Sequence, residues 1–267
     1  MVHRYINNDI LTISHMTVDR PQNDSYFSHM HYTNEILYFV CGDAEYTING
    51  YRYLLQPYDF LIIPKGVFHC LNLSSEAKYE NYVINFDDQL VDDSILERLF
   101  LPPLVFNIRG DKRMAGFFES IDYCSNTYSN EDFEKTCICI IKEMLMYCCY
   151  ASRTSTPIIE LKNSLVKNTI SYITENISSE LNAACIAKEL NVSASHLQNI
   201  FSQQMKIGLK QYITQRKIIS AHDDLLAGAS AVDTATKYGF DEYSTFYRQY
   251  KKIFGTSPST NKTKQQQ

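Results

Sequence analysis

The sequence has no tryptophan in 267 residues, and it has no apolar run near the roughly 18 to 20 residues that a transmembrane helix needs. The stretch from Met1 to Tyr5 also lacks the apolar core of a secretion signal. We therefore expect a cytoplasmic protein with no membrane partner.

Cysteine is plentiful, but its spacing is not that of a zinc site. Eight cysteines occur, Cys148 and Cys149 are adjacent, one residue separates Cys137 from Cys139, and no Cys-x-x-Cys pair is present. We interpret these residues as reduced, mostly buried thiols, and we expect no cofactor.

The net charge of -5 argues against a nucleic-acid partner, but this charge is unevenly distributed. From Glu160 onward there are 13 Lys and Arg against 9 Asp and Glu, which is a net +4, whereas the preceding residues carry -9. The chain is long enough for two domains, and the basic part is the second of these.

Residues 1–109 alternate β-rich runs with turn signals, as a sandwich or small barrel does. Asn49-Gly50 joins two such runs and is a strong hairpin signal. We predict strands over 35–40, 45–48, 51–55 and 60–63.

Residues 110–151 change to a helical pattern. Apolar residues recur at helical spacing, and the stripe is wide enough to cover the barrel, to meet a second copy of the chain, or to do both. This stripe comprises Phe133, Cys137, Ile140, Met144 and Cys148, widened by Ile138, Ile141 and Leu145. We assign 110–151 as a helical dimerisation segment and the polar, proline-ended stretch 152–160 as the interdomain linker.

Residues 161–267 read as a wholly helical domain that contains two helix-turn-helix units. Helices are predicted over 161–176, 183–190, 194–205, 209–226, 231–238 and 242–254. In each unit the second helix has apolar residues at i, i+3 and i+4 on one face, and this leaves its polar face able to enter a DNA major groove. Ser193 is the predicted N-cap of the first such helix, and Pro258 stops the last one from continuing.

The C-terminal residues resemble the AraC/XylS family of transcription regulators. The matching residues are Ala187, Ser193, Leu197, Phe201, Tyr212, Ala221, Leu225, Leu226, Val232, Ala235, Gly239, Phe240, Phe246, Lys251, Gly255 and Pro258. Three departures stand out. Lys206 replaces a usual glycine and is expected to adopt a left-handed conformation, Lys217 replaces a usual arginine, and Asn261-Lys262 replaces a Tyr-Arg pair.

The N-terminal part resembles the cupin-type, AraC-like ligand-binding domain of such regulators. His29-x-His31-x-x-x-Glu35 followed by Gly42 has the spacing of the first cupin motif, and Pro64-x-Gly66-x-x-His69 matches most of the second, although Tyr58 stands where a glycine usually opens it. The fold class expected is therefore α+β multidomain, with a cupin-like β-barrel plus helices and a C-terminal all-α domain with two helix-turn-helix units.

The cupin resemblance suggests three uses for the histidines. In metal-bearing cupins, residues equivalent to His29, His31, Glu35 and His69 bind the metal, but regulatory cupins often keep these residues and use the barrel as a small-molecule pocket. Hydrogen bonding within the fold is the third use. We predict an effector site formed by His29, His31, Glu35, Tyr38 and His69, without metal. The 20 tyrosines suit a sugar, although tyrosine is also common in strands for packing reasons.

The resemblance also indicates which residues contact DNA. Base contacts are expected from Ser195, Gln198 and Asn199 in the first unit and from Tyr243, Ser244, Thr245 and Arg248 in the second, with Arg248 placed to pair with a guanine. Lys206 and Lys251, together with Lys210 and Lys252, are expected to neutralise phosphates.

These observations predict a transcription regulator that binds promoter DNA as a homodimer, works with RNA polymerase and responds to a small-molecule effector. The resemblance implies an activator, because activation is more common than repression in this family. It is not expected to be an enzyme. Two rival hypotheses remain: a metal-dependent cupin enzyme with an accessory helical domain, and a constitutive dimeric DNA-binding protein without an effector.

Overall fold

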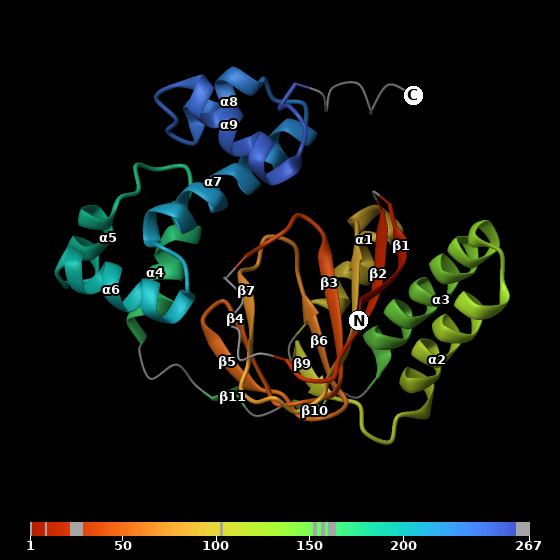
Figure 1. Ribbon diagram of the computed structural model, residues 1–267. Coiled ribbons are helices and arrows are strands. Elements are labelled where there is room, and N and C mark those ends of the chain that lie inside the picture. Colours follow the sequence, from red (N-terminus) through yellow and green to blue (C-terminus); the bar gives the residue numbers. More distant parts are fainter. Residues whose placement is uncertain are drawn as a thin grey trace. The chain divides into compact units, whose positions relative to one another are not determined.

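The computed structural model describes residues 2–8, 10–21, 29–101, 104–151, 154–155, 158–159 and 164–259. It divides into two compact units, one of residues 1–26 and 33–159 and the other of residues 27–32 and 160–267. The first unit is rich in β-strands and the second is helical, as predicted (Figure 1). None of the helices in these described ranges is both long and apolar enough to span a membrane.

Two antiparallel sheets form the β-barrel of the first unit. The larger sheet has the order β1 (Val2–Asn7), β2 (Leu11–Val18), β8 (Tyr79–Phe86), β3 (Asn34–Cys41), β6 (Asp59–Ile63), β9 (Val105–Asn107) and β10 (Thr154–Ser155). The smaller has the order β11 (Ile158–Ile159), β5 (Tyr51–Leu54), β4 (Ala44–Ile48) and β7 (His69–Leu73). The four strands predicted from the sequence correspond to β3, β4, β5 and β6.

The predicted hairpin joins β4 to β5. Asn49 and Gly50 have φ angles of 47° and 82°. A two-residue primed turn requires positive φ at both central positions, and Asn and Gly are the residues that adopt it at the least steric cost. The β4–β5 register, with Ile48 opposite Tyr51, follows directly from this turn.

Strand alternation gives the larger sheet two buried faces. On β3, Leu37 and Phe39 pack with residues of β4 and β7 in the core between the sheets. Ile36 and Tyr38 point to the other face, where they pack against helices. Successive side chains of a strand point to opposite faces, so one strand serves both cores.

Three helices of the first unit belong to that second core: α1 (Asp93–Leu99), α2 (Lys112–Thr127) and α3 (Asn130–Tyr150). A 3-10 turn, η1 (Asp88–Leu90), precedes them. The predicted stripe on α3 is largely buried, with Phe133, Cys137, Met144 and Cys148 inside and Ile140 half-buried. The hydroxyls of Tyr5 and Tyr82 donate to the two carboxylate oxygens of Asp122 at 3.0 and 2.6 Å, which links α2 to β1 and β8.

Part of the predicted linker forms strands. Thr154 and Ser155 pair with β9, and Ile158 and Ile159 pair with β5. The linker residues 152–153, 156–157 and 160 lie outside the described residues, as do the first predicted helical residues 161–163 and the Asn261-Lys262 pair. The two compact units divide after Ile159.

The described residues of the second unit form six helices: α4 (Ser164–Glu175), α5 (Ala183–Glu189), α6 (Ala194–Met205), α7 (Leu209–Leu226), α8 (Ala231–Lys237) and α9 (Tyr243–Phe254). Two helix pairs, α5–α6 and α8–α9, are the helix-turn-helix units, and α7 joins them (Figure 1). Side chains cap three of these helices, because Asn182, Ser193 and Ser230 each accept a hydrogen bond from a free amide of the first turn.

The cysteines are free thiols in the structure. All eight cysteines lie in the described ranges and none forms a disulfide. Four of them are buried, Cys70, Cys124, Cys137 and Cys148, and two are exposed, Cys139 and Cys185.

Candidate nucleic-acid interface and ligand site

Helix α6 has one buried face and one polar face. Leu197, Phe201 and Met205 are buried at spacings of four residues, and this fixes the helix against its unit. Ser195, Gln198 and Asn199, the residues predicted to read bases, are all exposed. The Ser193 hydroxyl accepts from the His196 amide at 3.2 Å, which confirms the predicted N-cap.

Helix α9 repeats this arrangement. Phe246 and Tyr250 are fully buried in the core formed with α7 and α8. Tyr243, Ser244 and Arg248 are exposed, whereas Thr245 is half-buried. A donor of the Arg248 guanidinium reaches the Thr245 hydroxyl at 3.3 Å, one helical turn away. This contact was not expected from the sequence. It holds the Arg248 guanidinium close to its own helix.

The predicted phosphate-binding lysines lie at the ends of these helices. Lys206 follows α6 with φ 55° and ψ 22°, which confirms the predicted left-handed conformation at a position where glycine is usual. Lys251 lies in the last turn of α9, where its positive charge also interacts favourably with the negative end of the helix dipole. Both lysines are exposed, as are Lys210 and Lys252.

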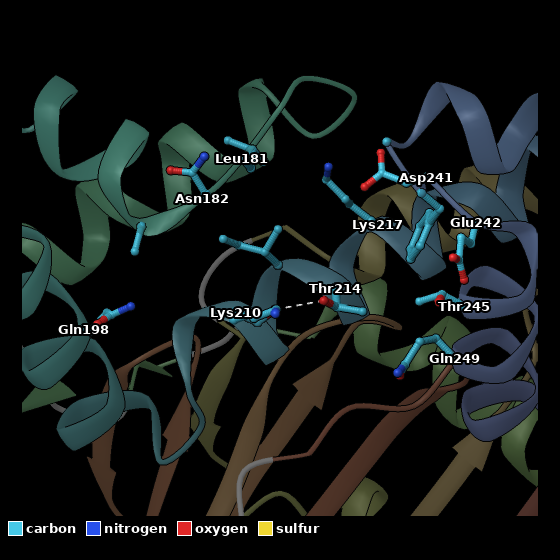
Figure 2. A pocket seen from close by; sticks show the side chains of 14 residues that line it. Leu181, Asn182, Gln198, Lys210, Thr214, Lys217, Asp241, Glu242, Thr245 and Gln249 are labelled. Atoms are coloured by element: carbon cyan, nitrogen blue, oxygen red, sulfur yellow. Dashed lines mark hydrogen bonds between the residues drawn. The ribbon is translucent and has the colours of Figure 1, made fainter.

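A groove of about 800 Å³ lies between the two helix-turn-helix units (Figure 2). Gln198 of α6 and Thr245 of α9 contribute to its lining, so the groove adjoins both polar faces. It is electrostatically mixed, because Lys210 and Lys217 of α7 line it together with the two acidic residues at the start of α9, Asp241 and Glu242.

A buried polar group lies in the first unit at Glu35, Tyr46 and His69. The Tyr46 hydroxyl donates to one Glu35 carboxylate oxygen at 3.0 Å, and the other carboxylate oxygen of Glu35 lies 3.8 Å from Nε2 of His69. The Tyr46 and His69 rings are stacked with centroids 5.9 Å apart. Burial, with the Glu35 charge beside it, holds the pKa of Tyr46 well above its usual value, so this phenol remains a proton donor.

Tyr46 was not predicted from the sequence, whereas Tyr38 was predicted and lies elsewhere. The Tyr38 ring packs on the other face of the larger sheet, stacked on Phe118 of α2 at 4.4 Å. Glu35 and Tyr38 are three residues apart on one strand, and an odd separation puts side chains on opposite faces. That spacing was a signal present in the sequence.

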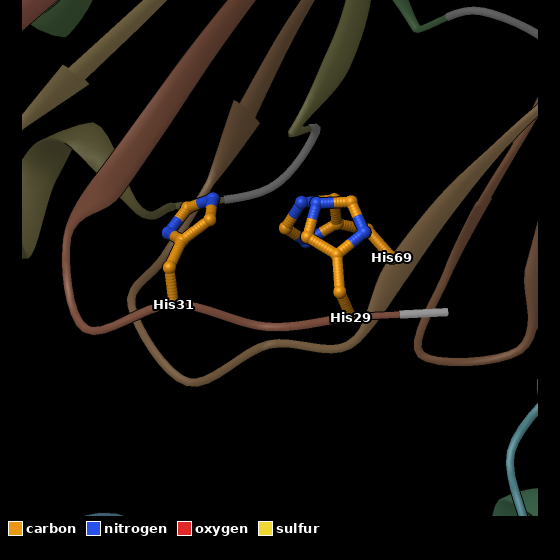
Figure 3. A group of neighbouring side chains, drawn as sticks. All are labelled: His29, His31 and His69. Carbon is orange, nitrogen blue, oxygen red and sulfur yellow. The ribbon is translucent and has the colours of Figure 1, made fainter. Parts of the chain in front are cut away.

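Figure 3 draws the three histidines of the cupin-like motifs: His29 and His31 lie in the segment before β3, and His69 begins β7. The His29 and His31 ring centroids are 6.1 Å apart. His29 is exposed, His31 is half-buried and His69 is buried. Nδ1 of His69 lies 2.9 Å from the Val67 carbonyl oxygen, a contact that orients this imidazole.

Two residues of the second cupin-like motif have left-handed backbone conformations. Tyr58 has φ 76°, a left-handed conformation that glycine adopts without steric cost, and Gly66 has φ 73°. The exposed Tyr58 ring lies 5.4 Å from the guanidinium carbon of Arg109.

Two family models match the chain. A model described as an AraC-like ligand binding domain matches residues 17–139, and a helix-turn-helix domain model matches residues 186–264. Together they span about three quarters of the sequence.

Several known proteins are similar to this chain. The Msm operon regulatory protein of Streptococcus mutans is 23% identical over 95% of this chain and 93% of its own length. The HTH-type transcriptional activator AarP of Providencia stuartii is 29% identical over 38% of this chain and 75% of its own length. The Melibiose operon regulatory protein of Escherichia coli is 30% identical over 38% of this chain and 34% of its own length.

Among solved structures, ToxT from Vibrio cholerae is 15% identical, covers 94% of this chain and 97% of its own, and has a TM-score of 0.39. The ligand-binding model matches residues of the first unit and the helix-turn-helix model matches residues of the second, and together they identify the family. The chain belongs to the AraC family of transcription regulators, with an AraC-like ligand-binding domain followed by a DNA-binding helix-turn-helix domain.

Proposed function

We propose that this regulator activates transcription by reading promoter DNA with α6 and α9, under the control of a small-molecule effector bound in the barrel. One observation carries the DNA-reading role. In both helices a buried apolar face fixes the helix, while the polar residues that direct readout needs lie on the exposed side.

Arg248 is the residue that we expect to contribute most to recognition of the DNA sequence. A bidentate arginine–guanine pair contributes about 1–3 kcal/mol of discrimination. Arg248→Ala should therefore weaken binding to a duplex selected from a random pool by about 5- to 150-fold, with a much smaller effect on unrelated DNA. Fluorescence anisotropy at one fixed salt concentration measures both affinities.

Lys252→Ala is the matched control for this experiment. Lys252 is exposed on the same helix and is expected to contact only phosphate. Its loss should weaken selected and unrelated duplexes by the same factor. An unchanged preference for the selected duplex in Arg248→Ala would refute the role proposed for Arg248.

For the effector, we propose that Glu35, Tyr46 and His69 form the polar end of the site. The Glu35 carboxylate accepts a hydrogen bond from the Tyr46 phenol and has lone pairs left to accept others, beside a core of apolar side chains. This combination suits a small molecule with hydroxyl groups, and a sugar is our first choice, in keeping with the name of the melibiose operon regulator. His29 and His31 remain predicted members of the site.

Ligand binding to the folded chain raises its melting temperature by mass action. Thermal shift against a panel of sugars should give a hit whose stabilisation disappears in Glu35→Gln. A panel of sugars and other metabolites that gives no stabilisation would favour the constitutive alternative. Metal analysis tests the remaining rival, because a stoichiometric transition metal in the purified chain would favour a cupin enzyme.

We further propose that the chain is a cytoplasmic homodimer that contacts RNA polymerase at promoters. Helices α2 and α3 carry exposed large side chains, with Tyr123 64% and Met146 43% exposed, and Tyr128, which follows α2, is 45% exposed. Such side chains support pairing of these helices between two copies. Sedimentation of Tyr123→Ser at micromolar concentration should show more monomer than wild type.

A further inference from the structure

Lys217 lies in the middle of α7, the helix that joins the two helix-turn-helix units, and only 8% of its surface is exposed. Burying an ammonium group is costly unless it is hydrogen bonded or paired. Desolvation lowers the pKa of Lys217, and the nearby Glu180 charge opposes this shift. A buried cation in a linking helix therefore needs a structural reason.

The Lys217 amine contacts segments from both halves of the unit. Nζ donates to the Ser179 carbonyl oxygen at 3.1 Å, in the segment between α4 and α5. On the other side, a Cβ added to Gly239, in the turn between α8 and α9, would lie 3.3 Å from Nζ. One side chain thus contacts the segment that precedes the first helix-turn-helix unit and the turn within the second.

Gly239 makes this close approach possible. Its φ of +69° is left-handed, and its lack of a side chain leaves room for the amine. Figure 2 shows Lys217 in the wall of the groove between the units, with Leu181 and Asp241 on either side. The charged groups around the groove are Lys210, Asp241 and Glu242, besides Lys217 itself.

We propose that Lys217 is a positioning residue that fixes the distance between α6 and α9, and so sets the spacing of the two DNA segments that these helices read together. The proposal rests on the proposed reading roles of both helices. Two linked readers gain affinity over one only when geometry lets both engage. A rigid spacing makes this gain sensitive to one inserted base pair, which moves the second segment by about 3.4 Å.

The test uses the full chain and two duplexes. One is selected from a random pool with the wild-type protein, and the other is the same duplex with one base pair inserted between the contacted segments. For the wild type, the insertion should lower affinity by about tenfold or more. Lys217→Met, which keeps the length of the side chain without its charge, should bind the original duplex about tenfold more weakly and tolerate the insertion within about twofold.

Lys210→Met is the matched control, because Lys210 is exposed on the same helix and lines the same groove. It should weaken binding to both duplexes equally and leave the insertion penalty unchanged. If Lys217→Met behaves like this control, Lys217 is only a charge contact and the proposal is wrong.

A distance measurement tests the proposal without DNA. Nitroxide labels at Gln203→Cys on α6 and Lys252→Cys on α9, with the exposed Cys139 and Cys185 replaced by serine, report the separation of the helices by pulsed electron spin resonance. Lys217→Met and Gly239→Ala should broaden the distance distribution, whereas Lys217→Arg should keep it narrow.

An unchanged distribution in Lys217→Met would overturn the proposal. Should Lys217→Met fail to fold, as circular dichroism would show, Gly239→Ala and Lys217→Arg decide in its place, and equal widths in these two would overturn it. A wild-type chain that binds no duplex would contradict the proposed DNA reading, while the label distances would still decide whether Lys217 fixes the helices.

Discussion

Replacing Lys206 by glycine should make the C-terminal unit more stable and its DNA binding weaker. Lys206 ends α6 with φ 55°, a conformation that costs an L-residue about 1–2 kcal/mol relative to glycine. Glycine offsets part of this gain, because it loses about 0.5–1 kcal/mol more conformational entropy on folding. The net increase in the free energy of unfolding should be about 0.5–1 kcal/mol.

Lys206→Ala separates the backbone effect from the charge effect. Alanine keeps the unfavourable left-handed conformation but loses the cation, so its stability should stay within about 0.5 kcal/mol of wild type. Both variants should lose one phosphate contact, which lowers the slope of log affinity against log salt concentration by about 0.9.

Denaturant unfolding followed by circular dichroism at 222 nm measures stability, since the second unit is helical. Each kcal/mol corresponds to about 4–8 °C in Tm for a domain of roughly 100 residues, so thermal melting is a second measure. If Lys206→Gly were no more stable than Lys206→Ala, the argument from backbone conformation would be refuted. If the salt slope did not change, Lys206 would not contact phosphate.

Two further predictions concern the first unit and the thiols. Cys139 and Cys185 are exposed and should react with a thiol reagent well before Cys137, because burial raises the pKa of the Cys137 thiol to about 12; comparable rates for all three would contradict the structure. The free energy of unfolding should also fall above about pH 10. In the folded state, burial first and the hydrogen bonds to Asp122 second raise the pKa of Tyr5 and Tyr82. The stability that these two protonated phenols contribute is complete below that pH, and it is lost as the pH rises and they lose their protons. Denaturant unfolding at several alkaline pH values should show a shallower decline in Asp122→Asn, and identical slopes would count against this network.

Local patterns in the sequence were enough to predict most of the elements. Asn49-Gly50 determined the β4–β5 hairpin because few other residues adopt positive φ in succession. The amphipathic period placed α6 and α9 within a residue or so of their observed bounds, and Ser193 and Gly255 mark where these helices begin and end. Even the left-handed Lys206 was expected, since a family position usually held by glycine implies its backbone conformation.

Contacts between residues that are far apart in the sequence became known only from the tertiary structure. Residues far apart in the sequence meet only through folding, so the sequence did not show that Tyr46 would join Glu35 and His69, or that residues 154–155 and 158–159 would pair with β9 and β5. Lys217 read as a minor substitution for arginine until its amine was seen between Ser179 and Gly239. Periodicity states which side chains share a face of an element, but which other element covers that face depends on the packing of the whole domain.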